Sequence, residues 1–452
     1  MKISGLILAS LLAFAGISLA VEPPDPGFAS KGRAASGIDP ALGIGNQSFS
    51  EDLIADLGAR FSGAKGANLL AGTRGAGLPS EGSPRMLVLL IEFDEFPARP
   101  GDDIKEMYAR IFGAGGKFPF ESLRAYYTRS SYGKLNIDGN VLGWYKAGKR
   151  ADVVQTREGR EALIKKALLS YGDHDFSQYD NNGDGVIDYF AVIWTGPVGE
   201  WATFWWGVAP RFSDKKFTVG GKSLNSYAWM GVVHKWEEPA SEFKIRTLIH
   251  ETGHALGLPD YYDYKPEAGP AGGVGNIDMM DSNHYDHNCF SKLMLGWISP
   301  KVVEQGGDFK LSPAGEAGQC LVLAPPGWDK NPFGEFFLVE NRRKIGNDTE
   351  KGFVGGLLVW HVDARLNQAG TNFLFNNSDT EHKLLKPLEA DGLEELENKL
   401  SKNFGFPDYY VKDRALGPDT VPSSRLYDGA DTGISLLSRG GDFDVSFKLG
   451  FK

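Results

Sequence analysis

The chain has 452 residues, which is enough for about three domains or for one large enzyme with appendages. Apolar residues at 42% and charged residues at 23% are close to the averages of globular proteins and exclude wholesale disorder. The net charge of −10, without a basic stripe, argues against nucleic acid or an anionic membrane as the main partner, and two cysteines cannot form a disulfide framework.

The first residues of the chain predict export. Lys2 gives a positive start, Ile3 to Ile17 form a short apolar run, and Ser18 and Ala20 place small residues where a signal peptidase recognises them. We therefore expect residues 1–20 to be a signal peptide and the mature protein to be soluble and secreted, to the extracellular space or the periplasm. No later segment reaches the ~18 apolar residues of a membrane span, so we expect no membrane partner after cleavage.

The next segments predict a mixed α/β region over residues 85–300. Residues 21–84 are rich in Gly, Ala and Ser and are expected to be a pro-segment or a linker. From Arg85 the run MLVLLIEFDEF is typical of a strand buried on both faces. The elements expected after it are helices at 102–112 and 120–129, a hairpin around an Asp-Gly turn at 134–145, a helix at 158–170 and a strand at 188–195.

The pattern changes after residue 300. Short runs with period-two or all-apolar patterns, separated by Gly and Asp, predict strands at 335–342, 355–363 and 441–450. A charged stretch at 388–402 predicts one helix among them. We expect residues 301–452 to form a β-rich C-terminal domain.

The stretch RTLIHETGHALGLPDYYD contains the residues that predict chemistry. His250 and His254 are four residues apart, so on a helix their Cβ atoms lie roughly 5–6 Å apart on one face, and both imidazoles can reach one ion at ~2.0–2.1 Å. Glu251 lies one step round the helix and can stand beside a metal without binding it. Two histidines and a glutamate in this spacing predict a zinc site with a general base.

A third ligand is predicted where this helix ends. Gly257 tolerates the left-handed backbone of a helix end and Pro259 prevents the helix from resuming, so the chain can fold back and bring Asp260 to the metal. Three protein ligands leave one position for water, whose pKa zinc lowers from ~15.7 towards ~7, and Glu251 would accept the proton of that water. The alternatives for the third ligand are Glu267 in a loop of Pro and Gly, and His284 or His287 in the segment SNHYDHN.

At these residues the sequence resembles the immune inhibitor A family of secreted bacterial zinc proteases, which are relatives of the metzincins. The family motif His-Glu-x-x-His-x-x-Gly-x-x-Asp is met at positions 250, 251, 254, 257 and 260, and residues 122–145, 289–300, 335–342 and 355–363 are also similar to family segments. NIDMMDSN resembles the methionine turn, which would place Met280 beneath the zinc. The resemblance implies an α+β, metzincin-like protease domain with a mixed twisted sheet, zinc and a pro-segment. Metzincins often have a Tyr two residues after the turn methionine, where this chain has Ser282; Tyr285 is a candidate for its role, although an aromatic loop residue more commonly packs.

A second metal site is predicted by a segment that matches the first nine positions of a calcium loop. Asp180, Asn182, Asp184 and Asp188 place side-chain oxygens at positions 1, 3, 5 and 9, and Val186 supplies a backbone carbonyl at position 7. The bidentate Glu of position 12 is absent, because that position is Ala191. We expect a weak, structural calcium site here.

Two further patterns leave alternatives open. Trp194, Trp201, Trp205 and Trp206 cluster before the predicted zinc helix. The resemblance to metzincin-like folds implies an edge strand in this region that binds the substrate backbone, but the tryptophans equally fit plain aromatic packing. Cys289 and Cys320 could pair after export.

Together these features predict a secreted zinc endopeptidase acting on proteins or peptides. The alternative is a calcium-stabilised secreted binding or adhesion protein with an inactive protease-like domain. The sequence leaves the oligomeric state open.

Overall fold

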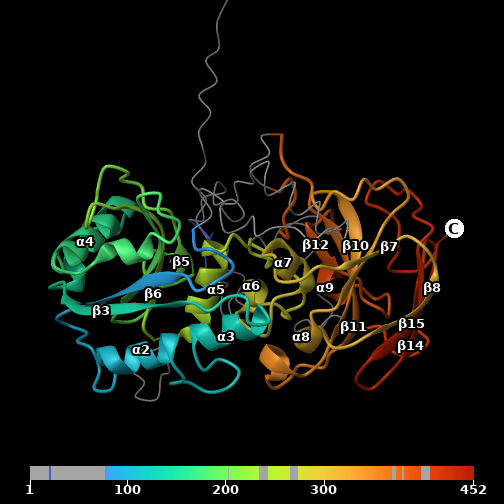
Figure 1. Ribbon diagram of the computed structural model, residues 1–452, viewed down its shortest axis with the longest axis horizontal. Helices are drawn as coiled ribbons and strands as arrows, with labels where there is room; N and C mark the ends of the chain where they lie inside the picture. The colour runs from blue at the N-terminus through green and yellow to red at the C-terminus, as the bar shows by residue number, and fades with distance from the viewer. Residues whose placement is uncertain are drawn as a thin grey trace, which may run out of the picture.

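The computed structural model describes residues 20–21, 77–201, 203–233, 243–264, 273–368, 373–378, 381–398 and 408–451. The described part of the chain is α+β, with one sheet built mainly before residue 300 and two sheets after it (Figure 1). Residues 1–19 of the predicted signal peptide and most of residues 21–84 lie outside the described residues, whereas Ala20, its last residue, is part of a short strand. None of the helices in the described segments is long and apolar enough to cross a membrane.

The first sheet has six strands. β2, β3, β4 and β6 run parallel, β5 adds antiparallel to β6, and β1 adds antiparallel to β5 at the edge. In spatial order the strands are β1 (Ala20–Val21), β5 (Val208–Ala209), β6 (Ser223–Gly231), β4 (Val186–Trp194), β2 (Arg85–Glu92) and β3 (Asp138–Lys146).

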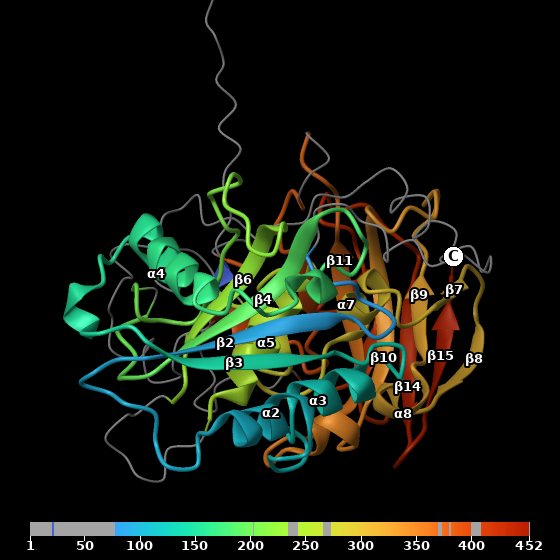
Figure 2. The same cartoon turned by 60° about the vertical axis from the view of Figure 1, so that its left-hand side comes forward.

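Helices cover both faces of this sheet, as Figure 2 shows with α4 on one side and α2 and α3 on the other. Along β2, Met86, Val88 and Leu90 pack into one core and Leu87 and Leu89 into another, as the two-residue period of a strand requires. The helices of this part are α2 (Ile104–Phe112), α3 (Leu123–Ser130), α4 (Arg157–Leu169), α5 (Ile245–Ala255), α6 (Met279–Ser282) and α7 (Cys289–Met294), with short 3-10 turns η3 (Arg150–Asp152) and η4 (Phe176–Tyr179).

The expected strands at 85 and 188 and the helices at 102–112, 120–129 and 158–170 are confirmed within a few residues. The predicted hairpin at 134–145 is wrong, because the segment forms the single strand β3, parallel to β2. A Cβ atom at Gly139 would lie 1.9 Å from the Met86 carbonyl oxygen. The glycine of the Asp-Gly pair therefore allows close approach of two strands and does not make a turn.

The strands after residue 300 form two further sheets. In spatial order the five-stranded sheet holds β12 (Leu385–Pro387), β11 (Gly356–Asp363), β10 (Glu335–Arg342), β9 (Cys320–Leu323) and β7 (Lys301–Val303). The four-stranded sheet holds β13 (Ala415–Leu416), β14 (Ser435–Gly440), β15 (Val445–Gly450) and β8 (Gly307–Leu311). Short helical turns lie between these strands at α8 (Ala314–Ala317), η5 (Gly346–Thr349) and α9 (Glu395–Asn398).

The strands predicted at 335–342, 355–363 and 441–450 are confirmed. The helix predicted at 388–402 is wrong over its first part, where the described residues are helical only in α9. Gly392 has φ +80°, and a Cβ atom there would lie 2.3 Å from the Val421 carbonyl oxygen, so a turn precedes the helix. The rest of that prediction lies outside the described residues.

The five-stranded sheet lies between the two other layers. On β10, Phe336 and Leu338 pack into the core that α3 and α5 also enter, whereas Phe337 and Val339 pack against the four-stranded sheet. One continuous core thus crosses residue 300, while the division into domains at 85–300 and 301–452 stays a prediction.

The two cysteines lie at this junction, Cys289 at the start of α7 and Cys320 at the start of β9, and both are buried, free thiols.

Candidate metal centre

Helix α5 brings the two predicted histidines onto one face. Leu248 and Ile249 bury the neighbouring positions and fix the helix in the core. The helix ends at Ala255, and Gly257 follows with φ +105° and donates its amide to the His254 carbonyl at 2.9 Å. The predicted break at Gly257 is therefore confirmed, and the chain turns back immediately after it.

The structure brings His250, His254 and Asp260 together. Their nearest ligand atoms form a triangle with sides of 3.1 Å between the two Nε2 atoms, 3.0 Å from His250 Nε2 to Asp260 Oδ1 and 3.2 Å from His254 Nε2 to the same oxygen. Atoms bound at about 2.0–2.2 Å to a tetrahedral zinc lie about 3.3–3.5 Å apart, so the triangle is close to the size that zinc requires. All three residues are buried, and they form one of the two groups of possible metal ligands in the described residues.

The backbone determines which ring nitrogens face this triangle. His250 Nδ1 lies 2.9 Å from the Met279 carbonyl and His254 Nδ1 lies 2.8 Å from the Leu258 carbonyl. A carbonyl can only accept a hydrogen bond, so each neutral imidazole carries its proton on Nδ1 and presents the lone pair of Nε2 to the other ring. Two lone pairs and a carboxylate oxygen therefore converge, an arrangement that a cation stabilises and that ordinary core packing does not require.

Asp260 is held as a carboxylate. Burial alone would raise the pKa of Asp260, whereas positive charge at the neighbouring His254 and His250 rings lowers that pKa below its usual range, as a cation held between the neutral rings would. Its second oxygen, Oδ2, accepts a hydrogen bond from the Tyr264 hydroxyl. An ionised, hydrogen-bonded carboxylate beside two lone pairs completes a donor set of the kind zinc binds.

Sequence reasoning missed Tyr264. The Tyr264 amide donates in turn to Ser378 Oγ at 3.0 Å, so this residue joins the predicted ligand to a loop that precedes β12. The only signal in the sequence is a run of three tyrosines around Asp263, which does not distinguish a ligand partner from packing.

Met280 lies directly against the middle of α5. A Cβ atom at Gly253 would lie 2.5 Å from Met280 Sδ, so only glycine allows the methionine to come this close between His250 and His254. The Asp278 side chain begins α6 by accepting from the Met280 amide at 2.7 Å. Met280 thus lies against the helix that carries both histidines, while its place beneath a zinc ion stays a prediction.

Glu251 is fully buried on the same helix. The charge of Glu251 acts on the two tyrosines near Asp260. Burial is the main cause that raises the pKa values of Tyr262 and Tyr264, and the Glu251 carboxylate raises both pKa values further. Glu251 therefore lies close to the segment that supplies Asp260, and its role as a base belongs to the proposal below.

The alternative third ligands do not join this group among the described residues. His284 pairs with Glu350 at 2.8 Å, and His287 stacks on Tyr127 with ring centroids 5.8 Å apart. Glu267 lies outside the described residues. Tyr285, the candidate for oxyanion support, packs against Phe353 with centroids 5.0 Å apart.

The calcium loop has a different arrangement. Asp180 Oδ2 accepts from the Lys222 ammonium at 2.7 Å and from the Gly185 amide at 2.9 Å, and Asp180 Oδ1 accepts from the Asp184 amide at 3.0 Å. The Asn182 side chain accepts from the Asp184 amide, and Asp188 accepts from Asn181. The carboxylates of this loop are not gathered into one of the groups of possible ligands, and calcium stays a prediction.

The second group of possible ligands, which sequence reasoning missed, consists of Glu389, Glu395 and Asp408. It contains no imidazole. Burial and the neighbouring Glu397 raise the pKa of Glu389 to about 8, so a proton can relieve the repulsion among these carboxylates.

The tryptophans before α5 form an aromatic core. Trp194 and Trp205 lie edge to face at 4.9 Å, and Trp205 and Trp229 have centroids 5.6 Å apart. These ring contacts fit the second of the two interpretations given above for the tryptophans, aromatic packing.

Comparison with known proteins agrees with the resemblance of the motif. The chain is 30% identical to immune inhibitor A of Bacillus thuringiensis subsp. alesti over 234 residues, covering 40% of this chain and 33% of that protein. It is 28% identical to the pre-pro-metalloprotease PrtV of Vibrio cholerae serotype O1 over 176 residues, covering 32% of this chain and 19% of PrtV.

The chain thus spans about a third of the length of the first relative and about a fifth of the second. No family model matches the chain. Both comparisons thus agree with the resemblance, and over the matched residues the chain is similar to immune inhibitor A and to a pre-pro-metalloprotease.

Proposed function

We propose that the chain is a secreted zinc-dependent endopeptidase with a metzincin-like catalytic domain. His250, His254 and Asp260 would hold the zinc, and Glu251 would be the general base. The observation that carries this proposal is the convergence of two Nε2 lone pairs and Asp260 Oδ1 within 3.2 Å of one another, with both rings oriented by backbone carbonyls.

The chemistry divides between the ion and the protein. Bound zinc would supply a Lewis acid that lowers the pKa of water and polarises the scissile carbonyl. Glu251 takes up the proton that the attacking water gives up and delivers it to the leaving amine. Met279 and Leu258 carbonyls keep both imidazoles in the tautomer that binds metal, and Tyr264 orients Asp260.

The edge of the first sheet supports a polypeptide substrate. β5 lies beside α5, and its outer edge already pairs antiparallel with Ala20 and Val21. An extended segment can thus add to the sheet next to the candidate metal centre, which is how a substrate backbone would bind. Signal cleavage after Ala20 would leave Val21 at this edge, and this supports a zymogen in which the start of the pro-segment occupies the edge before maturation.

The test is casein hydrolysis by the exported, matured chain. We expect hydrolysis to stop in 1,10-phenanthroline and to return with added zinc. Glu251→Gln should lower kcat by about 10²–10⁴-fold while zinc content and circular dichroism stay those of the native chain, because it removes only the base.

Undiminished hydrolysis by Glu251→Gln would contradict the assignment of the base. A native chain that binds zinc but hydrolyses neither casein nor other unfolded proteins would favour the alternative, a binding or adhesion protein with an inactive protease-like domain.

A further inference from the structure

Arg342 is a buried cation far along the chain from α5. It is the last residue of β10 and lies on the face that Phe336 and Leu338 turn towards the core shared with α3 and α5. Its exposed fraction is only 2%, so its charge must be met by partners inside the protein.

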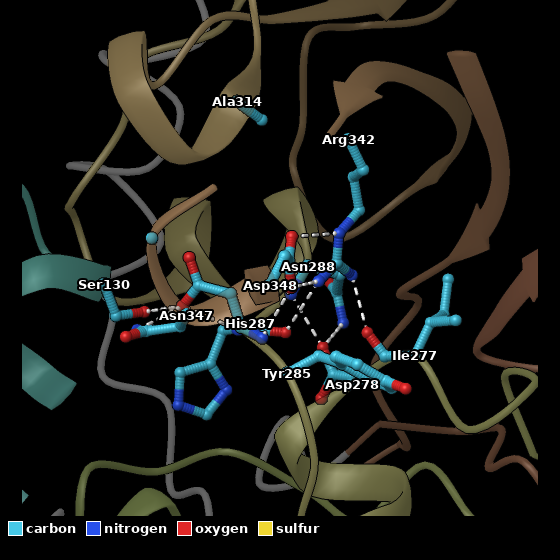
Figure 3. A network of polar contacts seen from close by, with 12 residues as sticks. Ser130, Ile277, Asp278, Tyr285, His287, Asn288, Ala314, Arg342, Asn347 and Asp348 are labelled. Atoms are coloured by element: carbon cyan, nitrogen blue, oxygen red, sulfur yellow. Dashed lines mark hydrogen bonds and ion pairs between the residues drawn. The ribbon is translucent and has the colours of Figure 1, made fainter. Parts of the chain in front are cut away.

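The guanidinium binds two backbone carbonyls and one carboxylate. Nη1 donates to the Ile277 carbonyl at 2.7 Å and Nη2 to the Asp286 carbonyl at 3.2 Å, while Nε and Nη2 form a fork on Asp348 at 3.0 and 2.5 Å (Figure 3). The planar guanidinium makes four hydrogen bonds to these three acceptors, including the bidentate fork, whereas the donors of a lysine diverge from one nitrogen and cannot form such a fork.

The segment held in this way carries the groups that orient the candidate metal centre. Two residues after Ile277, the Met279 carbonyl accepts from His250 Nδ1 at 2.9 Å, and Met280 then packs against Gly253. Arg342 therefore binds both ends of the segment from Ile277 to Asp286. Within this segment, the Met279 carbonyl sets the orientation of the His250 imidazole.

Other hydrogen bonds join residues of the same segment to one another and to its neighbours. Asp278 Oδ2 accepts from the Asn288 amide at 2.6 Å, and Asp286 Oδ2 accepts from the Lys292 ammonium at 2.6 Å. Asp286 Oδ1 accepts from Ser130 Oγ at 2.6 Å, which joins the segment to α3. Arg342 is the member of this network that comes from the five-stranded sheet.

We propose that Arg342 is a positioning residue for the candidate metal centre and that the five-stranded sheet acts through it on metal affinity. The inference rests on the proposed function and deepens it, because it assigns to a residue after position 300 control over the orientation of His250. Loss of the fork would let the carbonyl of Met279 move, and the imidazole would then bind the ion in a less favourable orientation.

The test compares three variants of the full chain. Arg342→Lys keeps a charge opposite Asp348 but cannot form the bidentate fork while also donating to both carbonyls. The pair Arg342→Met with Asp348→Asn removes the fork without leaving a buried, unpaired carboxylate, and it serves if the lysine variant does not fold. Arg343→Met is the matched control, since Arg343 donates to the carbonyls of Gly441 and Phe443 on the other side of β10.

Zinc affinity is measured by competition with a chromophoric chelator, and the geometry of the site by the visible absorption of bound Co²⁺. We expect zinc affinity about 10–100-fold weaker and an altered cobalt spectrum for the Arg342 variants, with native values for Arg343→Met. A role in stability alone would lower the melting temperature and leave the cobalt spectrum of the folded protein unchanged.

Folded Arg342 variants with native zinc affinity and a native cobalt spectrum would overturn this inference and leave the proposed function standing. If the native chain binds no more zinc or cobalt than His254→Ala does, the proposed function itself is wrong, and the inference fails with it.

Discussion

The His–His–Asp group and the Asp180–Asp188 loop were both predicted as metal sites from residue spacing, and their contacts differ in kind. In the first, three acceptors face one another and the protons lie on the far sides of the rings. In the second, amides and the Lys222 ammonium already donate to the carboxylates. A cation site is thus distinguished by acceptors that lack internal donors, and spacing alone does not reveal this difference.

The largest effect is expected from removing a ligand of the first site. Asp260→Ala should weaken zinc binding by more than about 100-fold, because a structural zinc contributes about 10–16 kcal/mol shared among its ligands. Chelator competition measures the change. Asp184→Ala is the matched control in the loop and should leave zinc affinity unchanged. Equal losses of zinc affinity in the two variants would contradict the distinction drawn here between the two sites.

A buried imidazole without a metal gives the next test. His287 is enclosed by aromatic rings, and burial lowers its pKa to about 3. Its folded pKa is thus below the ordinary value of about 6.5, so stability is complete above that pH and falls as pH drops towards the folded value. His287→Phe should remove this loss.

Urea unfolding at about pH 7 and pH 5 measures the effect. The free energy of unfolding of the native chain should fall by about 2 kcal/mol more than that of His287→Phe over this interval. The comparison with the variant is needed because Asp278 and Asp281, whose pKa values burial raises to about 6 and about 7, titrate in the same range with the opposite sign. Parallel pH profiles of the two proteins would contradict the assignment of His287.

The smallest effect concerns the loop. If Asp180 to Asp188 bind calcium, the Lys222 ammonium competes with the ion for Asp180, so Lys222→Met should strengthen calcium binding about tenfold. At a fixed, subsaturating calcium concentration the variant should then gain about 1–2 °C more in melting temperature than the native chain. A melting temperature independent of calcium in both proteins would remove the calcium prediction.

Local patterns predicted the elements whose cause is local. Three such predictions are confirmed, and each depends only on residues within one or two turns of backbone. They are the apolar strand β2, the four-residue spacing of His250 and His254 on one helix, and the glycine that ends α5. Gly139 shows the limit of this reasoning. An Asp-Gly pair fits a hairpin locally, but the neighbouring strand β2 requires the glycine here for close approach.

The candidate site was predictable only in part for the same reason. Tyr264 and Arg342 carry no motif, and their roles depend on contacts with Asp260 and Ile277 that only the folded chain creates. The lone pairs of the two imidazoles are likewise aimed by carbonyls of Met279 and Leu258, which no side-chain pattern encodes.

The continuity of the core across residue 300 has a practical consequence for dissecting the protein. Trp297 and Leu293 pack in the same cluster as Val322 and Leu338. A recombinant fragment ending near residue 300 would expose this apolar surface to water and would be expected to aggregate. The residues before and after position 300 are therefore not separable modules, and biochemical work should begin with a chain that contains both.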